Sequence, residues 1–393
     1  MNEAVIVGYV RTPIGKFGGG LASLSAMDLG GVAIRAALER AGVPPEAVDY
    51  VIMGHVLQAG QGQITARQAA TKGGIGMDVP ALTVNKVCLS GLTAVALADQ
   101  AIRLGEQDVV VAGGMESMSN APYLLPKARG GYRMGNGEIV DAMIHDGLWC
   151  AFDNGHMGEG SDRLNERYGI TREQQDAWAA ASHERAAAAW KDGRFADEVT
   201  PVEVPQRRGE PILVDSDEGV RPGTTTESLG RLRPAFTADG TITAGNASQI
   251  SDGAAAVVLT SRAKADELGL TPLARVLSYA TVAGPDPSLH HQPAATIEKA
   301  AAKLGAAPDS FDLYEMNEAF ASVAIFSADR LGVPADKVNV NGGAVALGHP
   351  IGCTGARITT SLLSQLRARG GGRGAAALCG GGGQGEAVVF ETL

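Results

Sequence analysis

An internal repeat constrains the fold of this 393-residue chain more than any other feature. The segments Val32–Asp49 and Ala295–Asp312 share one pattern, in which a run with apolar residues at helical spacing ends at a glycine and a proline-containing turn follows. Each segment leads into a short apolar strand, Tyr50–Met53 in the first copy and Leu313–Met316 in the second. The sequence therefore predicts two copies of one β/α unit.

The repeat continues downstream of these strands. Ala94–Gly114 runs from a helix to a strand and a glycine pair, and Ile358–Gly381 has the same order. Each copy closes on a further apolar strand, Ala255–Thr260 and Ala387–Phe390. Because these strands are continuous apolar runs, we expect central strands that helices cover on both faces, in an α/β fold.

The two copies flank a central insert. We expect an N-terminal half formed by residues 1–118 and 246–270, an insert over 119–245 and a C-terminal half over 271–393. Within the insert, the Ala-rich segment Thr171–Trp190 opens with a capping-box pattern, which predicts a helix. An insert on a symmetric scaffold usually builds substrate contacts, and the alternative is a structural lid or an oligomer contact.

Composition narrows the classes of partner and compartment. Asp and Glu (43) outnumber Lys and Arg (33), and the net charge of −10 argues against a nucleic-acid partner. The chain has no basic N-terminal leader and no long uninterrupted apolar window, so neither a signal peptide nor a membrane partner is expected. Four cysteines in a chain of this length do not form a disulfide framework, which favours a reducing, cytoplasmic compartment.

Cys88 is the first residue that could carry chemistry. It follows the predicted strand Ala81–Val84 and opens a predicted helix that runs through Arg103. Unpaired N–H groups and the positive end of the helix dipole favour a thiolate at such a place, which makes Cys88 a candidate nucleophile. The alternative is a small buried cysteine that fills a strand-to-helix turn.

His349 is the second candidate. Gly348 and Pro350 stiffen the loop around its imidazole, and it lies in the second copy near the place that Cys88 takes in the first. Two equivalent helix N-termini are therefore expected to face each other across a pseudo-twofold axis, as a site between the halves requires.

Cys379 precedes a glycine-rich run in which Gly380, Gly382 and Gly385 match G-x-G-x-x-G. A dinucleotide fingerprint must open a helix, but the strand Ala387–Phe390 follows here, so we reject a nucleotide site. What remains is a cysteine at the end of a strand, beside N–H groups that can form an oxyanion hole.

Asn317 and Glu318 follow the strand of the second copy, where polar side chains either hold a turn or orient a substrate and water. No pair of potential ligands has zinc-finger spacing, so no metal site is expected.

Together these stretches resemble the thiolase family, acyl-CoA acetyltransferases that make or cleave 3-ketoacyl-CoA. The likeness runs from Val10–Gly15 to the closing glycine-rich strand, and the four motifs stand in the family's order. The resemblance implies the thiolase fold, in which two repeated β/α halves form a layered α-β-α-β-α core with a central loop-domain insert.

The resemblance also implies roles. Cys88 would accept the acyl group as a thioester, His349 would take its proton, and Cys379 would act as acid and base at the substrate's α-carbon. Asn317 would hold a water that completes one oxyanion hole with His349, and the N–H groups of Cys88 and Gly381 would form the other. Coenzyme A is then substrate and product, and no cofactor or metal is implied.

The residues that the resemblance implies for binding CoA and the acyl group lie mostly in the insert and the chain that returns from it. They are His156, Met157, Arg221, Ser228, Phe236, Ala244, Ser248, Ala319 and Phe320.

Acetoacetyl-CoA formation is the first expectation for the reaction. The alternative is a degradative 3-ketoacyl-CoA thiolase of broader chain length, because Ala283–His291 departs from the Met-Gly-x-Gly-Pro stretch that is common in short-chain members. A non-catalytic thiolase-like acyl-CoA- or lipid-binding protein is the remote alternative, since no catalytic residue is missing. The family implies a homodimer or homotetramer, and Leu124–Arg133 is the segment that could dock two dimers.

Overall fold

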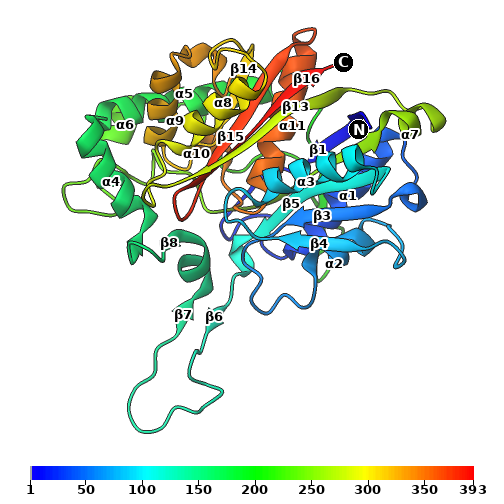
Figure 1. Cartoon of the computed structure of the whole chain (residues 1–393). Helices are drawn as coiled ribbons and strands as arrows, with labels where there is room; N and C mark the ends of the chain where they lie inside the picture. Colours follow the sequence, from blue (N-terminus) through cyan, green and yellow to red (C-terminus); the bar gives the residue numbers. More distant parts are fainter. Residues whose placement is uncertain (1) are drawn as a thin grey trace.

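A large mixed sheet forms the centre of the protein in the computed structural model, which describes residues 2–393 (Figure 1). The sheet has 10 strands, in the order β14-β15-β16-β13-β1-β12-β5-β3-β4, with β2 paired to β12. The strands are β1 (Ala4–Arg11), β2 (Gly15–Lys16), β3 (Tyr50–Gly54), β4 (Ala81–Val84), β5 (Val109–Ser117), β12 (Ser251–Ser261), β13 (Ala274–Ala283), β14 (Leu313–Met316), β15 (Arg373–Gly380) and β16 (Gln384–Thr392).

The strand pairing shows the predicted repeat. In the first half β3 runs parallel to β5, β5 antiparallel to β12, and β12 antiparallel to β1. In the second half β14 runs parallel to β15, β15 antiparallel to β16, and β16 antiparallel to β13. The halves join through one registered pair, Ile6 and Ala274. The equivalent strands β1 and β13 each contain a register shift, at Ile6/Gly8 and Val276/Ser278.

Helices form three layers around the two halves of the sheet. One apolar cluster packs α1 (Ala26–Ala41) and α2 (Thr65–Lys72) on the outer face of the first half, and another packs α8 (Gln292–Lys303) and α9 (Ala321–Leu331) on the outer face of the second. A third cluster places α3 (Ser90–Leu104) and α11 (Thr354–Ala368) between the two halves. The predicted α-β-α-β-α layering is confirmed.

The helix α3 has the composition of a membrane span, but it lies in this middle layer. The window Val87–Leu104 has a mean hydropathy of 1.4 over 18 residues. A core helix of a layered α/β protein reaches this hydropathy because sheets cover it on both sides.

The first turns of the two middle helices, α3 and α11, lie in backbone contact. A Cβ on Gly355 would lie 2.1 Å from the backbone nitrogen of Leu92, and a Cβ on Gly91 would lie 2.7 Å from that of Ala356. Only glycine allows backbones to approach so closely. The predicted meeting of two helix N-termini is therefore confirmed, and the loops that precede α3 and α11 share one space.

The insert adds the π-helix Met143–Leu148 and three α-helices, α4 (Met157–Tyr168), α5 (Arg172–Lys191) and α6 (Thr226–Gly230), of which the α-helices lie at one end of the core. The predicted capping box begins α5, where Thr171 and Gln174 exchange side chain-to-backbone hydrogen bonds. Two-residue strands and other short elements complete the chain: β6 (Tyr123–Leu124), β7 (Val140–Asp141), β8 (Trp149–Cys150), β9 (Gly155–His156), β10 (Val202–Val204), β11 (Ile212–Val214), α7 (Arg262–Glu267) and α10 (Ala344–Leu347).

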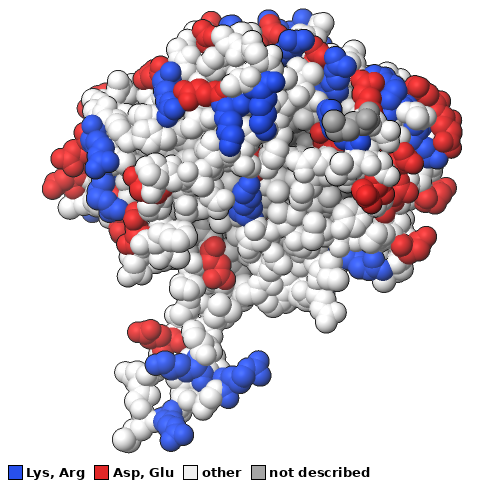
Figure 2. All heavy atoms as spheres, in the orientation of Figure 1, with Lys and Arg blue, Asp and Glu red and all other residues white. Residues whose placement is uncertain are grey.

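An arm leaves the insert between β6 and β7 and stands clear of the body (Figure 1). Figure 2 shows basic side chains gathered on it, and the residues between the two strands include Lys127, Arg129 and Arg133, all exposed. The arm contains the predicted docking segment Leu124–Arg133.

Candidate active site

A cavity of about 530 Å³ opens where the two halves meet the insert. Most of the residues singled out from the sequence line it: Cys88, His156, Met157, Arg221, Phe236, Ala244, Ser248, Ala319, Phe320, His349, Cys379 and Gly381. They come from all three predicted parts of the chain, and the wall is predominantly apolar, which suits a site that excludes water.

A strained turn between β4 and α3 presents Cys88. Val87 has φ 50°, a left-handed conformation that is unfavourable for a β-branched residue. The Ser90 hydroxyl holds the turn, since it donates to the Val87 carbonyl (2.6 Å) and accepts from the Lys86 N–H (2.8 Å). Because Cys88 lies within this turn, two residues ahead of α3, its side chain faces the cavity.

The electrostatics of Cys88 differ from the sequence-based expectation. Burial raises the pKa of its thiol to about 12, although the nearby backbone N–H groups of Gly381 and of Cys88 itself act in the opposite direction. The pKa is therefore raised, where the sequence led us to expect conditions that favour a thiolate, because loss of hydration outweighs these N–H groups. Cys88 is a neutral thiol at pH 7.

His349 contacts Cys88 through a defined ring nitrogen. Its Nε2 lies 3.2 Å from the Cys88 sulfur, and its Nδ1 lies 2.6 Å from the Thr354 hydroxyl. That hydroxyl donates its only hydrogen to the Pro350 carbonyl (2.9 Å), so its oxygen accepts from Nδ1–H. The lone pair is thus on Nε2, directed at the thiol.

The imidazole is also neutral at rest. Burial, and to a smaller extent the positive charge of Arg357, lower the pKa of His349 to about 3. A neutral imidazole beside a neutral thiol is a hydrogen-bonded pair that can exchange a proton, not a preformed ion pair.

Asn317 lies behind His349. Its Nδ2 is 3.4 Å from His349 Nε2, and its buried Oδ1 has no hydrogen-bond partner within residues 2–393. The side chain of Asn339 fixes this end of β14 by two hydrogen bonds to the backbone of Met316.

Glu318 turns the other way and resolves the choice that the sequence left open. Its carboxylate accepts from Trp178, Ser182, Asn339 and the Val345 N–H, so it ties the turn to α5 and to the His349 loop. Glu318 holds the turn, and Asn317, the other residue of the pair, points toward His349 from behind.

Cys379 brings a second thiol to the cavity from near the end of β15. It is 1% exposed, and burial, followed by the nearby Cys88 sulfur, raises the pKa of its thiol. The glycines beyond it form the turn of the β15–β16 hairpin, so the glycine-rich run leads into a strand, as predicted, and opens no helix. Gly381, in this turn, directs its N–H toward the Cys88 sulfur.

Two predicted residues lie outside the lining. Asn317 is buried behind it, as described above. Ser228 is exposed on α6, where its hydroxyl donates to the Thr225 carbonyl (2.8 Å) as part of a capping box.

Sequence reasoning missed two groups of residues. One is Thr354, whose only signal was a hydroxyl five residues after His349 in a stiff loop. The other is an apolar wall that the chain returning from the arm and the loop before α8 contribute: Met143, Ile144, Leu148 and Leu289. Within residues 2–393, no group of three His, Cys, Asp or Glu side chains is placed to hold a metal ion.

Comparison with known proteins identifies the family. Residues 4–263 match the family model described as "Thiolase, N-terminal domain", and residues 270–392 match "Thiolase, C-terminal domain". The chain belongs to the thiolase family. The resemblance drawn from the four motifs is confirmed.

Relatives of this thiolase match it over their whole length. A "Probable acetyl-CoA acetyltransferase" of Mycolicibacterium smegmatis is 57% identical and covers 98% of this chain and 100% of the relative. An "Acetyl-CoA acetyltransferase" of Pseudomonas aeruginosa is 53% identical over 99% of both chains. The crystal structure of the Bacillus anthracis acetyl-CoA acetyltransferase superposes with a TM-score of 0.97 at 43% identity, over 100% of this chain and 99% of that one.

The resting protonation state of the thiolase site is testable. Because burial raises the pKa of Cys88 and lowers that of His349, the far-ultraviolet absorbance of a thiolate should be absent at pH 7. Titration of the protein and of its Cys88→Ser variant measures the difference. Thiolate absorbance at neutral pH that disappears in Cys88→Ser would contradict a neutral pair.

Thr354 should act through His349. Thr354→Val keeps the side chain's size but removes the acceptor for Nδ1–H, so alkylation of Cys88 by iodoacetamide should slow about tenfold to a hundredfold. Thr359→Val is a matched control, because this buried threonine on the same helix only donates to the Gly355 carbonyl. Equal rates in the two variants would show that Thr354 does not orient the imidazole.

Proposed function

We propose that the chain is an acetyl-CoA C-acetyltransferase that catalyses the reversible Claisen condensation of two acetyl-CoA to acetoacetyl-CoA and CoA. The observation that carries this proposal is one cavity in which the Cys88 thiol lies 3.2 Å from the lone-pair nitrogen of His349 and a second thiol, Cys379, lies close by. The names of the full-length relatives support the same reaction.

Acylation comes first in the proposed mechanism. His349 Nε2 takes the Cys88 proton, and the thiolate sulfur attacks the carbonyl carbon of acetyl-CoA. The N–H groups of Cys88 and Gly381 stabilise the tetrahedral oxyanion. When the carbon–sulfur bond to CoA breaks, the leaving CoA thiolate takes the proton of Cys379, so CoA departs as a thiol.

Condensation follows on the acetylated Cys88. The Cys379 thiolate removes a proton from the methyl group of the second acetyl-CoA, and burial, which raises the pKa of this thiol, makes its thiolate a stronger base. Protonated His349 and a water held by Asn317 stabilise the enolate oxygen. The enolate carbon attacks the Cys88 thioester, and the departing Cys88 thiolate recovers its proton from His349.

The cavity wall also supports an acyl-CoA substrate. The rings of Phe236 and Phe320 meet edge to face with centroids 5.9 Å apart, and His156 lies against Phe236 with centroids 6.1 Å apart. Together with Met157 and Ala319 they form a narrow apolar passage that suits a pantetheine arm. Arg221 at the cavity edge, and Ser228 on the neighbouring surface, would meet the nucleotide end.

We also propose that the protein assembles as a homotetramer in the cytoplasm. The basic arm that contains Leu124–Arg133 leaves large apolar side chains exposed, with Met134 fully exposed and Ile139 64% exposed. A second dimer of the same chain would cover them in a homotetramer. The four cysteines are free thiols, which suits the cytoplasm, and no cofactor besides the substrate CoA enters the mechanism.

Cleavage assays test the reaction and its chain length together. CoA-dependent cleavage of acetoacetyl-CoA should exceed that of a medium-chain 3-ketoacyl-CoA, because Leu289 and Met157 pack in the same apolar cluster as Cys379 and would meet a longer acyl chain. Cys88→Ser should abolish it. Equal or faster cleavage of the longer substrate would instead favour a degradative thiolase, and cleavage of neither would support a binding protein.

A further inference from the structure

The loop that leads to β12 forms one wall of the cavity without regular structure of its own. Thr243, Ala244, Ala247 and Ser248 line the cavity, yet the chain between α6 and β12 contains no helix and only isolated bridges to strand-like partners. A few backbone hydrogen bonds, such as the one from the Ser248 N–H to the Ala319 carbonyl (3.1 Å), hold this loop, and side-chain hydrogen bonds supply much of the rest.

Asn246 supplies three of those side-chain bonds. Its side chain is fully buried: Oδ1 accepts from the Thr243 N–H (2.8 Å), and Nδ2 donates to the Thr241 carbonyl (3.1 Å) and to Asp176 Oδ1 (2.9 Å). Its carbonyl accepts from the N–H of Ala321, at the start of α9 (2.9 Å). Asn246 thus closes the loop on itself and binds it to the insert helix α5.

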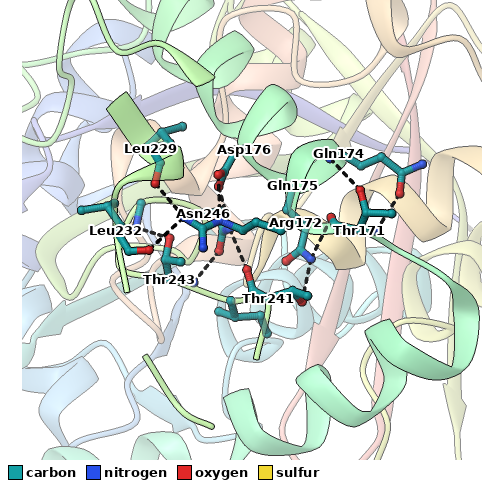
Figure 3. Close-up of polar contacts among 12 residues, drawn as sticks. Thr171, Arg172, Gln174, Gln175, Asp176, Leu229, Leu232, Thr241, Thr243 and Asn246 are labelled. Carbon is teal, nitrogen blue, oxygen red and sulfur yellow. Dashed lines mark hydrogen bonds and ion pairs between the residues drawn. The ribbon is translucent and has the colours of Figure 1, made fainter. Parts of the chain in front are cut away.

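The Asp176 carboxylate binds both the loop, through Asn246, and the guanidinium group of Arg172. Asp176 is 2% exposed, and its second oxygen accepts from Arg172 Nε, one turn earlier on α5 (2.7 Å). The contacts therefore form a row, Asn246–Asp176–Arg172, and Figure 3 shows the Asp176 carboxylate above the other two side chains with dashed lines running down from it. A buried carboxylate with partners on both oxygens holds them at fixed distances.

Arg172 extends the row to a second segment. Its terminal nitrogen donates to the carbonyls of Leu229 (2.6 Å) and Leu232 (3.1 Å), in and just after α6 (Figure 3). The side chains of these two leucines pack against Gly245, where an added Cβ would lie 2.6 Å from each of them. The ion pair between Arg172 and Asp176 on α5 therefore connects two segments to this helix: Arg172 binds the chain around α6, and Asp176 binds the cavity loop.

We propose that Arg172, Asp176 and Asn246 are positioning residues for CoA. The row fixes the distance between the Ala244–Ser248 loop, which faces the pantetheine, and the chain around α6, which faces the nucleotide end. This inference rests on the proposed function, and none of the three residues touches the reacting thiols.

A second set of hydrogen bonds, from Asp162, should keep the loop folded when the Asn246–Asp176–Arg172 contacts are weakened. Asp162 on α4 accepts from the N–H groups of Thr241 (2.9 Å) and Ile242 (3.0 Å), independently of Asp176. A mild change in the row should therefore alter the loop's position without unfolding the insert.

Asp176→Asn is that change. An amide presents one oxygen, so whichever way it turns, its NH₂ group faces either Arg172 Nε or Asn246 Nδ2, and one hydrogen bond is lost. The KM for acetyl-CoA should rise about tenfold, the effect of losing one charge-assisted hydrogen bond. Alkylation of Cys88 by iodoacetamide, which needs no CoA, should stay within about twofold of the unmodified protein.

Two further variants complete the test. Glu267→Gln also neutralises a carboxylate in a short-range helix ion pair, with Lys264 on α7, but the pair is remote from the cavity and should leave both readouts unchanged. Arg172→Lys keeps the charge and loses the fork to Leu229 and Leu232, so it should raise the KM for acetyl-CoA more than that for acetyl-pantetheine, which lacks the nucleotide. It also decides the matter if Asp176→Asn does not fold.

The outcomes separate this inference from the proposed function. An unchanged KM for acetyl-CoA in folded variants would overturn it, and so would a parallel fall in alkylation and acylation, which indicates general damage to the site. If acetyl-CoA does not acylate the unmodified protein at all, the proposed function itself fails.

Discussion

The contact between the starts of α3 and α11 is the constraint on which the site depends. Because Gly91 and Gly355 have no side chains, the two helices begin within backbone contact, and the loops before them are forced into one space. The two helix starts are equivalent, but the residues before them differ. Cys88 lies two residues before Ser90, the first residue of α3, and the equivalent position before Thr354, the first residue of α11, is Gly352. His349 lies three residues earlier, so one half supplies the thiol and the other the base.

Burial determines the resting protonation state of the groups in this site. Desolvation raises the pKa of both cavity thiols and lowers that of His349, so the resting groups are all neutral. In the proposed mechanism a proton moves from Cys88 to His349 only as the sulfur begins to form a bond to a substrate carbonyl, where N–H groups would face the developing charge. Because Cys88 and His349 are neutral at rest, they also lose less hydration free energy when a thioester substrate enters the cavity than an ion pair would.

Much of the fold could be predicted because its determinants are local. The helix-glycine-strand order of the two copies indicated the halves, and the capping box at Thr171 indicated the start of α5. The raised pKa of Cys88 was not expected, because burial is a property of the whole fold. Thr354 and the Asp176–Asn246 contact were missed for a related reason: each acts through a partner that a linear pattern does not identify, and Asp176 and Asn246 lie 70 residues apart.

The proposed mechanism gives the two thiols separate roles, with Cys88 as the acyl carrier and Cys379 as the base, and the structure of the Cys379→Ala variant with acetyl-CoA distinguishes them. We expect an acetyl group on Cys88, its carbonyl oxygen on the N–H of Gly381, and no acetoacetyl-CoA, because the base for the second step is missing. An acetyl group on another residue, or condensation by this variant, would show that the two thiols do not have these roles.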